Sequence, residues 1–140
     1  MPEEATTPDL VGRYRRSIEA ANRGDFDAVM SFWGPDPVWD TSPAGMGTFE
    51  GPAAVRGFFE DWVSSYEEYE IEAEEIAELG NGVTYAIVLQ RGRPVGSNGE
   101  VRVRSATVGL WDNGLLTRVT NYPDIDAARA DAERLAQERK

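Results

Sequence analysis

The sequence predicts a single α+β domain over residues 1–140, in which helices gather on one side of a curved sheet. Helical patterns occupy most of the first half of the chain, and four long strands joined by turns occupy most of the second. A chain of 140 residues with 41% hydrophobic residues can bury one core and is too short for two. We therefore expect one compact unit without a linker.

Two helices are predicted near the start of the chain. In the first helix, Thr7 is suited to the N-cap and Pro8 to the first helical position, and Gly24 ends the helix. Its apolar face would consist of Leu10, Tyr14, Ile18 and Ala21. Asp25 can cap a short second helix, which the glycine and prolines of residues 34–37 would stop. This second helix would carry Phe26, Val29, Met30 and Trp33.

A third helix follows a short extended stretch over residues 38–42 and a loop over residues 43–47. Gly51 and Pro52 open this helix, which has the broadest apolar face in the chain. The face would consist of Val55, Phe58, Phe59, Trp62, Val63 and Tyr66. We expect this helix to form a wall or a lid over the interior.

The next two segments predict a β-hairpin. Residues 69–79 alternate acidic and apolar residues as a strand does, although their composition also favours a helix. The turn signal of residues 79–83 requires a preceding strand and decides for β structure. Residues 83–90 are almost all apolar or β-branched, which indicates a strand covered on both faces. Residues 91–99 would then form a loop.

The last part of the chain predicts two more strands and a helix. The strands cover residues 101–111 and 115–122, and residues 112–114 form the turn between them. Asp124 caps an alanine-rich helix that extends to about Gln137. The four strands together form an antiparallel meander.

Composition excludes several classes of function. The net charge of −11 disfavours nucleic acid and anionic membranes as partners. The chain has no cysteine and no histidine, which excludes disulfides, thiol or histidine catalysis and the usual transition-metal sites. We expect no metal and no cofactor. Because no apolar run of 18 residues and no secretory signal is present, we also expect no membrane span and a cytoplasmic location.

Six short motifs carry a resemblance to a known family. They are Gly24-Asp25-Phe26, Trp39-Asp40, residues 47–52, the helix around Trp62, Asp112-Asn113-Gly114 and Tyr122-Pro123-Asp124. Over about residues 8–125, their order and spacing resemble the SnoaL-like branch of the nuclear transport factor 2 (NTF2-like) superfamily. The resemblance implies a cystatin-like α+β cone, in which a strongly curved, mostly antiparallel sheet wraps around three helices. It also implies an apolar pocket at the open end and often a homodimer through the sheet, and here a C-terminal helix follows.

The resemblance carries over no catalytic set. Alignment with the ketosteroid isomerase pattern places that family's tyrosine at Ser17, its basic aspartate at Thr41 and its protonated aspartate at Thr107. Three hydroxyls cannot replace a carboxylate base and strong donors. The pocket histidine of dehydratase relatives would also fall near Thr107. Steroid isomerisation and histidine-based dehydration are therefore disfavoured.

Asp40 is the candidate catalytic carboxylate, because it lies one residue from the aligned base position and beside Trp39. Strand alternation opposes this role. If Trp39 and Thr41 face the interior, Asp40 faces outward unless a bulge redirects it. The direction of Asp40 in the structure should decide between chemistry and a surface role.

Aromatic and hydroxyl side chains are the candidate ligand-binding residues, although aromatic residues at these spacings could equally be ordinary core. The candidates are Ser17, Trp33, Trp39, Thr41, Phe58, Trp62, Tyr85, Thr107 and Tyr122. Arg102 and Arg104 could bind an anion inside the cone, but strand parity favours an outward position and ion pairs with Glu70, Glu72 or Glu74. The acidic run of residues 67–78 indicates a solvated strand face rather than a calcium site.

Two functions are compatible with these patterns. The first is binding of a small hydrophobic molecule in an apolar aromatic pocket without catalysis. The alternative is a SnoaL-like enzyme of the cyclase, isomerase, dehydratase or hydrolase type, which acts on a small hydrophobic or polyketide-like substrate by cofactor-independent acid–base chemistry. Ala106, Val108 and Leu110 would face the outer side of the sheet, and an uncovered apolar face there predicts a homodimer.

Overall fold

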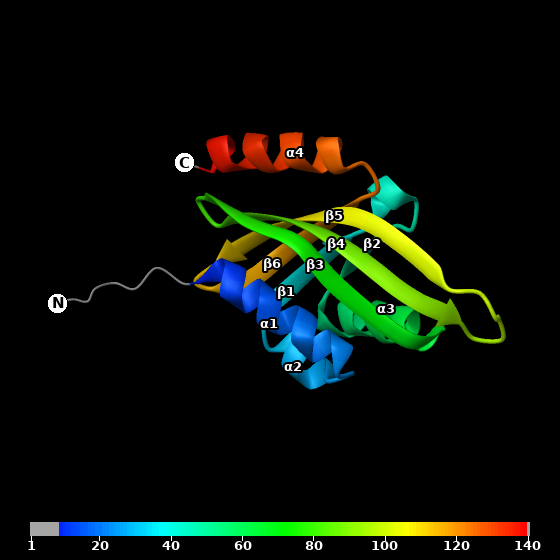
Figure 1. Ribbon diagram of the computed structural model, residues 1–140. Helices are drawn as coiled ribbons and strands as arrows, with labels where there is room; N and C mark the ends of the chain where they lie inside the picture. The colour runs from blue at the N-terminus through cyan, green and yellow to red at the C-terminus, as the bar shows by residue number, and fades with distance from the viewer. Residues whose placement is uncertain (1–8, 140) are drawn as a thin grey trace.

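A computed structural model describes residues 9–139, and Figure 1 shows helices packed with one strongly curved sheet. The α-helices in this part of the chain are α1 (Leu10–Asn22), α2 (Phe26–Met30), α3 (Pro52–Ser64) and α4 (Ile125–Glu138), and a short 3-10 helix, η1, covers Ser42–Ala44. The strands are β1 (Trp33–Asp40), β2 (Thr48–Glu50), β3 (Tyr66–Gly80), β4 (Val83–Pro94), β5 (Val101–Asp112) and β6 (Leu115–Tyr122). The predicted α+β class and the antiparallel meander of β3 to β6 are confirmed.

The helix α1 begins later than predicted. Asp9, and not Thr7, is its N-cap, and the Asp9 carboxylate accepts a hydrogen bond of 2.9 Å from the backbone N–H of Gly12. Thr7 and Pro8 lie outside the described residues. Asp25 caps α2 as predicted, since its side chain accepts from the backbone N–H of Ala28.

Two predicted boundaries were wrong in the first half of the chain. Trp33 opens strand β1 instead of ending the second helix. The prolines that were expected to stop a helix lie inside β1, in the part of the strand where the pairing with β6 is interrupted between Trp33 and Val38. A proline has no backbone N–H to donate to a neighbouring strand, so it is tolerated at such an irregularity. Tyr66 starts β3 rather than extending the face of α3. A three-residue strand, β2, was not predicted.

Strand β4 is also longer than predicted and continues to Pro94 through the expected loop. Arg91 and Arg93 form ion pairs with the neighbouring strand β3, on Glu70 and Glu68, which support this extension. Arg104 pairs with Glu74 at 2.7 Å, as predicted, whereas Arg102 pairs with Glu100. The basic and acidic runs of the sequence therefore largely neutralise one another on the sheet surface.

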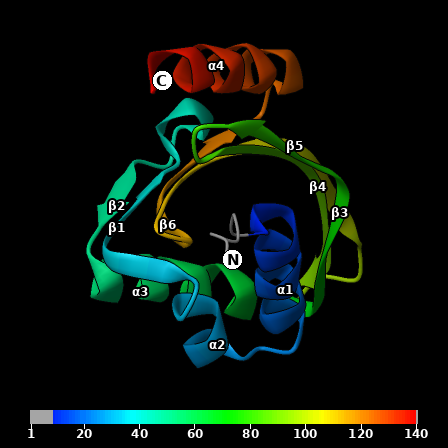
Figure 2. The same ribbon diagram turned by 90° about the vertical axis from the view of Figure 1, so that its left-hand side faces the viewer.

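The sheet has the strand order β2-β1-β6-β5-β4-β3, and the pair of β1 with β6 is parallel while the others are antiparallel. Register shifts along β3, including one between Glu67 and Glu70 where Glu68 has a φ of 57°, bend the strand. Figure 2 shows the sheet as an arc that encloses α1, with α2 and α3 below it. The predicted cone around three helices is confirmed.

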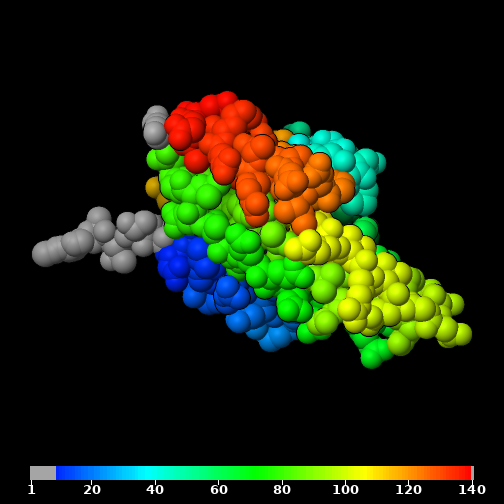
Figure 3. All heavy atoms as spheres, turned by 45° about the horizontal axis from the view of Figure 1, so that its top comes forward, coloured from blue at the N-terminus to red at the C-terminus, as the bar shows by residue number. Residues whose placement is uncertain are grey.

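Helix α4 lies on the opposite, convex face of the sheet, across β3 to β5 (Figures 2 and 3). Its small side chains pack against the outward residues of β4 and β5 in one buried cluster. The cluster consists of Val83, Tyr85, Ile87, Ala106, Val108, Ala128, Ala132 and Ala136. Asn81 donates a 2.7 Å hydrogen bond to the carbonyl of Ala136 and fixes the end of the helix.

The position of α4 corrects the expectation that this apolar outer face is left bare for a second subunit. Ala106 and Val108 face outward as predicted, but α4 of the same chain covers them. The apolar outer face therefore no longer supports a homodimer, and the homodimer stays a prediction. A native mass of twice 15.5 kDa at micromolar concentration would support it. Among residues 9–139, no helix combines the length and hydropathy that crossing a membrane requires.

Candidate functional site

A cavity of about 270 Å³ lies between the concave face of the sheet and helices α1 and α3. This volume is close to the lower end of the range for small-molecule pockets, which is roughly 300–1,000 Å³. Most of its lining is apolar. Ala44 and Met46, from the loop after β1, line it together with Pro123.

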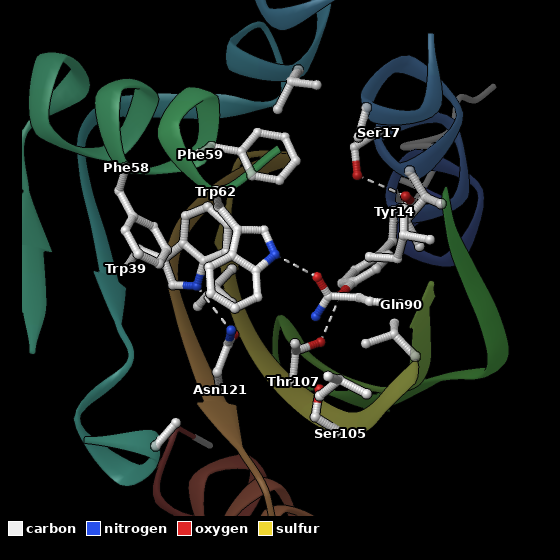
Figure 4. Close-up of a pocket in the computed structure, with 18 of the residues that line it drawn as sticks. Tyr14, Ser17, Trp39, Phe58, Phe59, Trp62, Gln90, Ser105, Thr107 and Asn121 are labelled. Atoms are coloured by element: carbon white, nitrogen blue, oxygen red, sulfur yellow. Dashed lines mark hydrogen bonds between the residues drawn. The ribbon is translucent and has the colours of Figure 1, made fainter. Parts of the chain in front are cut away.

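One wall of the cavity is aromatic, and Figure 4 shows its rings side by side. The ring of Trp39 contacts Phe58 at 5.2 Å and Phe59 at 5.4 Å between centroids, and Phe58 lies 6.3 Å from Trp62. Trp39 comes from β1, and the other three rings lie on one side of α3 because Trp62 follows Phe58 and Phe59 by four and three positions, which is about one helical turn. The helix that was expected to form a wall does so.

The opposite wall comes from the meander and from α1, and it carries the polar groups. Gln90 of β4 accepts hydrogen bonds from Trp62 Nε1 at 2.8 Å and from the Tyr69 hydroxyl at 2.5 Å. Asn121 of β6 accepts one from Trp39 Nε1 at 3.1 Å. The two indole N–H groups of the aromatic wall are thus hydrogen-bonded to two amides.

Tyr14 and Thr107 form a second polar pair in this wall. Their hydroxyl oxygens are 2.5 Å apart and buried. Ser17 lies on the same helix, one turn after Tyr14 (Figure 4). Ser17 donates to the backbone carbonyl of Tyr14 at 2.7 Å. Burial raises the pKa of Tyr14 above its ordinary value, although the hydrogen bond with Thr107 opposes this.

The second phenol of the cavity, Tyr69, is partly buried and behaves in the same way. Burial is the main cause that raises its pKa well above the ordinary value of 10.0. Both phenols therefore stay protonated at neutral pH and act as neutral hydrogen-bonding groups. Among the described residues, no Asp or Glu side chain lines the cavity.

The cavity brings together seven of the nine predicted ligand-binding residues. They are Ser17, Trp33, Trp39, Phe58, Trp62, Thr107 and Tyr122. Thr41 does not reach it, because its side chain is fully buried and its hydroxyl donates to the carbonyl of Gly47 at 2.6 Å. Tyr85 lies on the convex face against α4, with the guanidinium of Arg129 5.4 Å from its ring centre.

Asp40, the candidate base, does not line the cavity. Its carboxylate accepts hydrogen bonds from the backbone and side chain of Ser42, from Thr48 at 3.0 Å and from Arg118 at 2.8 Å. Partial burial opposes ionisation, but these hydrogen bonds and the charge of Arg118 together lower the pKa of Asp40 below its ordinary value. The carboxylate is a fixed, ionised clamp on the loop that carries Met46.

Replacing Asp40 by Asn tests this structural role. We expect the free energy of unfolding at pH 7 to fall by about 1.5 kcal/mol, the lower end for hydrogen bonds to a charged group, because Arg118 is partly exposed. Since the folded-state pKa of Asp40 is lowered, its stabilising effect is present above the ordinary value of 3.8 and is lost as the pH falls through the lowered pKa. Chemical denaturation at pH 7 and at pH 3 measures the difference. A variant as stable as the wild type at pH 7 would contradict the clamp.

Four cavity residues of chemical importance were missed: Tyr14, Tyr69, Gln90 and Asn121. Tyr14 was identified only as part of an apolar helix face. Strand pairing contained a usable signal for one of the amides, because Thr107, which was correctly predicted to face inward, is paired directly with Asn121. Gln90 shares the inward side of β4 with Val88, the partner of Ser105.

The chain is similar to one known protein family and to solved structures of the same fold. A family model described as SnoaL-like domain matches residues 14–119. A search of curated proteins found no match. An NTF2-like protein of unknown function from Burkholderia pseudomallei is 22% identical, with a TM-score of 0.72 over 86% of this chain and 95% of that one.

Two further solved structures carry descriptions of a ligand or a role. A Mycobacterium tuberculosis protein in complex with estradiol-17β-hemisuccinate is 16% identical, with a TM-score of 0.71 over 86% of this chain and 97% of that one. An epoxide hydrolase/cyclase-like enzyme of pyran ring formation in the polyether salinomycin is 17% identical, with a TM-score of 0.71 over 81% of this chain and 88% of that one. At these identities the likeness establishes the fold alone.

Proposed function

The chain belongs to the SnoaL-like domain family and has the NTF2-like fold, and from this premise we propose that it binds a small, neutral, hydrophobic molecule in the cavity. The observation that carries the proposal is the chemistry of the lining. Apolar and aromatic side chains dominate it, and its polar side chains are amides, hydroxyls, indole N–H groups and one arginine. Such a site gains affinity from apolar burial and orientation from a few hydrogen bonds.

Charge at the cavity supports a neutral ligand. Arg104 is the one cationic side chain in the lining within residues 9–139, and its guanidinium is already paired with Glu74. The two phenols of the lining, Tyr14 and Tyr69, have raised pKa values and carry no charge at neutral pH. A ligand with a full charge would therefore lose its hydration without gaining a free counter-ion.

The enzyme alternative needs a group that takes up a proton. Asp40 was the candidate, and its oxygens are held by Ser42, Thr48 and Arg118 outside the cavity. The phenols hold their protons at neutral pH and are donors rather than bases. For these reasons we prefer binding without acid–base turnover over the cyclase, isomerase, dehydratase or hydrolase reactions that the sequence left open.

The Mycobacterium tuberculosis protein supports the hydrophobic, ring-containing part of the proposal and not its neutrality, because that protein was solved with a steroid that also carries a hemisuccinate acid group. The supporting feature of this chain is its own aromatic wall. Trp39, Phe58, Phe59 and Trp62 offer flat apolar surfaces on which a ring system can stack.

A thermal-shift screen of neutral hydrophobic molecules tests the proposal. A molecule that binds the folded state alone should raise the melting temperature with concentration, by the equivalent of about 2.7 kcal/mol at 100 times its Kd. The bound molecule should be recovered unchanged when the complex is extracted and analysed by mass spectrometry. A screen in which neutral bicyclic molecules produce no shift would contradict binding, and recovery of a product would favour the enzyme alternative.

A further inference from the structure

The two cavity amides suggest which ligands the site prefers. Resting on the proposed function, we infer that Gln90 and Asn121 are fixed hydrogen-bond donors that select molecules with carbonyl-type acceptor oxygens, such as ketones and quinones, over hydrocarbons and amines of the same size. The inference depends on which atom of each amide is already occupied and which is open to the cavity.

The orientation of the Gln90 amide is determined by its neighbours. Trp62 Nε1 can only donate a hydrogen bond, so the atom that it contacts at 2.8 Å must be the amide oxygen. The Tyr69 hydroxyl donates to the same oxygen at 2.5 Å. With both donors on the oxygen, a flip of the amide would place its NH₂ group against an indole N–H. The NH₂ group of Gln90 is therefore the half of the amide that neither Trp62 nor Tyr69 contacts.

Asn121 is oriented by the same chemistry. Trp39 Nε1 donates to the Asn121 oxygen at 3.1 Å, and an indole nitrogen has no acceptor capacity that could favour the flipped amide. The two tryptophans of the aromatic wall thus have a second effect besides their apolar surface. Each one holds an amide so that its oxygen is used and its NH₂ group is left over.

Both NH₂ groups are available to a ligand. Neither NH₂ group has a hydrogen-bond partner within residues 9–139. In that range, the one buried side-chain oxygen or nitrogen without a partner is the Tyr85 hydroxyl, on the other face of the sheet, so neither NH₂ nitrogen is a buried atom. The two nitrogens therefore border open space. Gln90 and Asn121 both line the cavity, and in Figure 4 the dashed line from Trp62 ends on the Gln90 oxygen and not on its nitrogen.

The hydroxyl pair adds to this donor character. Tyr14 and Thr107 share one hydrogen between their oxygens at 2.5 Å, which leaves the hydrogen of the accepting hydroxyl without a partner in the pair. Thr107 is paired directly with Asn121 in the sheet, so these groups lie side by side. A protonated amine would meet donors here and no carboxylate, and a hydrocarbon would leave the donors unpaired.

Four bicyclic probes of similar size test the inference on the unmodified protein. They are tetralin, 1-tetralone, 1,4-naphthoquinone and 1-aminotetralin, compared by ligand-observed NMR and thermal shift at pH 7. Each carbonyl that accepts a hydrogen bond should improve affinity by roughly 2- to 12-fold, so the order should be naphthoquinone, tetralone, tetralin, with the amine weakest. The chain has no cysteine with which the quinone could react.

The variant Gln90→Glu tests the NH₂ donor of Gln90 directly. The carboxylate still accepts from Trp62 and Tyr69 but has no NH₂ group to offer, so the preference for tetralone over tetralin should fall by the same factor of roughly 2 to 12 and binding of 1-aminotetralin should increase. Gln137→Glu, on the exposed side of α4, makes the same change of charge away from the cavity and should bind as the wild type does. Asn121→Asp and its exposed counterpart Asn98→Asp form a second matched pair.

The outcomes separate this inference from the proposed function. Binding of tetralin as tight as that of tetralone and naphthoquinone would overturn donor selection while leaving hydrophobic binding intact. Binding of none of the four probes by the wild type would overturn both. If Gln90→Glu does not fold, the order of the four probes on the wild type still decides the inference.

Discussion

Trp62→Ala should remain folded and bind 1-tetralone roughly 30-fold less tightly, which corresponds to about 2 kcal/mol, the threshold for an energetically dominant aromatic contact. The ring of Trp62 is only partly buried and borders the cavity, so its removal takes away ligand contact rather than core. The variant also removes one of the two donors that hold the Gln90 oxygen. Titration followed by NMR measures the affinity, and chemical denaturation measures the stability.

Trp111→Ala is the matched control, because Trp111 is a tryptophan of the core and does not line the cavity. It is 3% exposed, and its indole N–H donates to Thr84 Oγ1 at 2.8 Å. Its truncation should cost about 3–5 kcal/mol of stability, a large part of the roughly 5–15 kcal/mol of a typical domain. If Trp62→Ala unfolds as Trp111→Ala does, Trp62 is core and the aromatic wall is not a ligand surface.

Ala132→Glu should release α4 from the convex face of the sheet. Ala132 is fully buried against the outward residues of β4 and β5, and a carboxylate there would be surrounded by the hydrophobic side chains of this cluster. An uncompensated buried charge costs about 3–5 kcal/mol, which detachment of the helix can relieve. Denaturation should show the loss of stability, and amide hydrogen exchange should show loss of protection over residues 125–138.

Ala130→Glu is the control for this variant, since Ala130 lies on the exposed side of the same helix. The same side chain is added to the same helix, and only burial differs. Its stability should lie within about 0.5 kcal/mol of the wild type. Equal stability of Ala132→Glu and Ala130→Glu would show that α4 is not packed on the sheet, and the outer face would again be open to a second subunit.

Local signals were reliable where they depended on near neighbours. Asp25 and Asp124 cap the helices that they were predicted to cap, because an N-cap hydrogen bond involves residues two or three positions apart. Strand β6 occupies the predicted range, and the turn before it has positive φ values at Asn113 and Gly114, as that dipeptide favours.

The candidate site was predicted in part for the same reason. Helical spacing identified Phe58 and Trp62, and strand alternation placed Thr107 inside. Strand alternation also predicted that Asp40 faces away from the interior, and in the structure Asp40 does not line the cavity. Thr41 and Tyr85 were assigned to the cavity although their side chains are occupied elsewhere, by the carbonyl of Gly47 and by α4.

What the sequence by itself determined about this protein is therefore its class, the order of all its long helices and strands, and the apolar, aromatic character of its interior, since these follow from composition and from periods of two and 3.6 residues. Only the tertiary structure decided which face each element covers and which polar groups meet. The placement of α4 on the convex face and the pairing of Trp62 with Gln90, 28 positions apart, or of Trp39 with Asn121, 82 positions apart, depend on how distant segments pack. Such contacts leave no periodic signal in the chain, because they depend on the curvature of the whole sheet rather than on neighbouring residues.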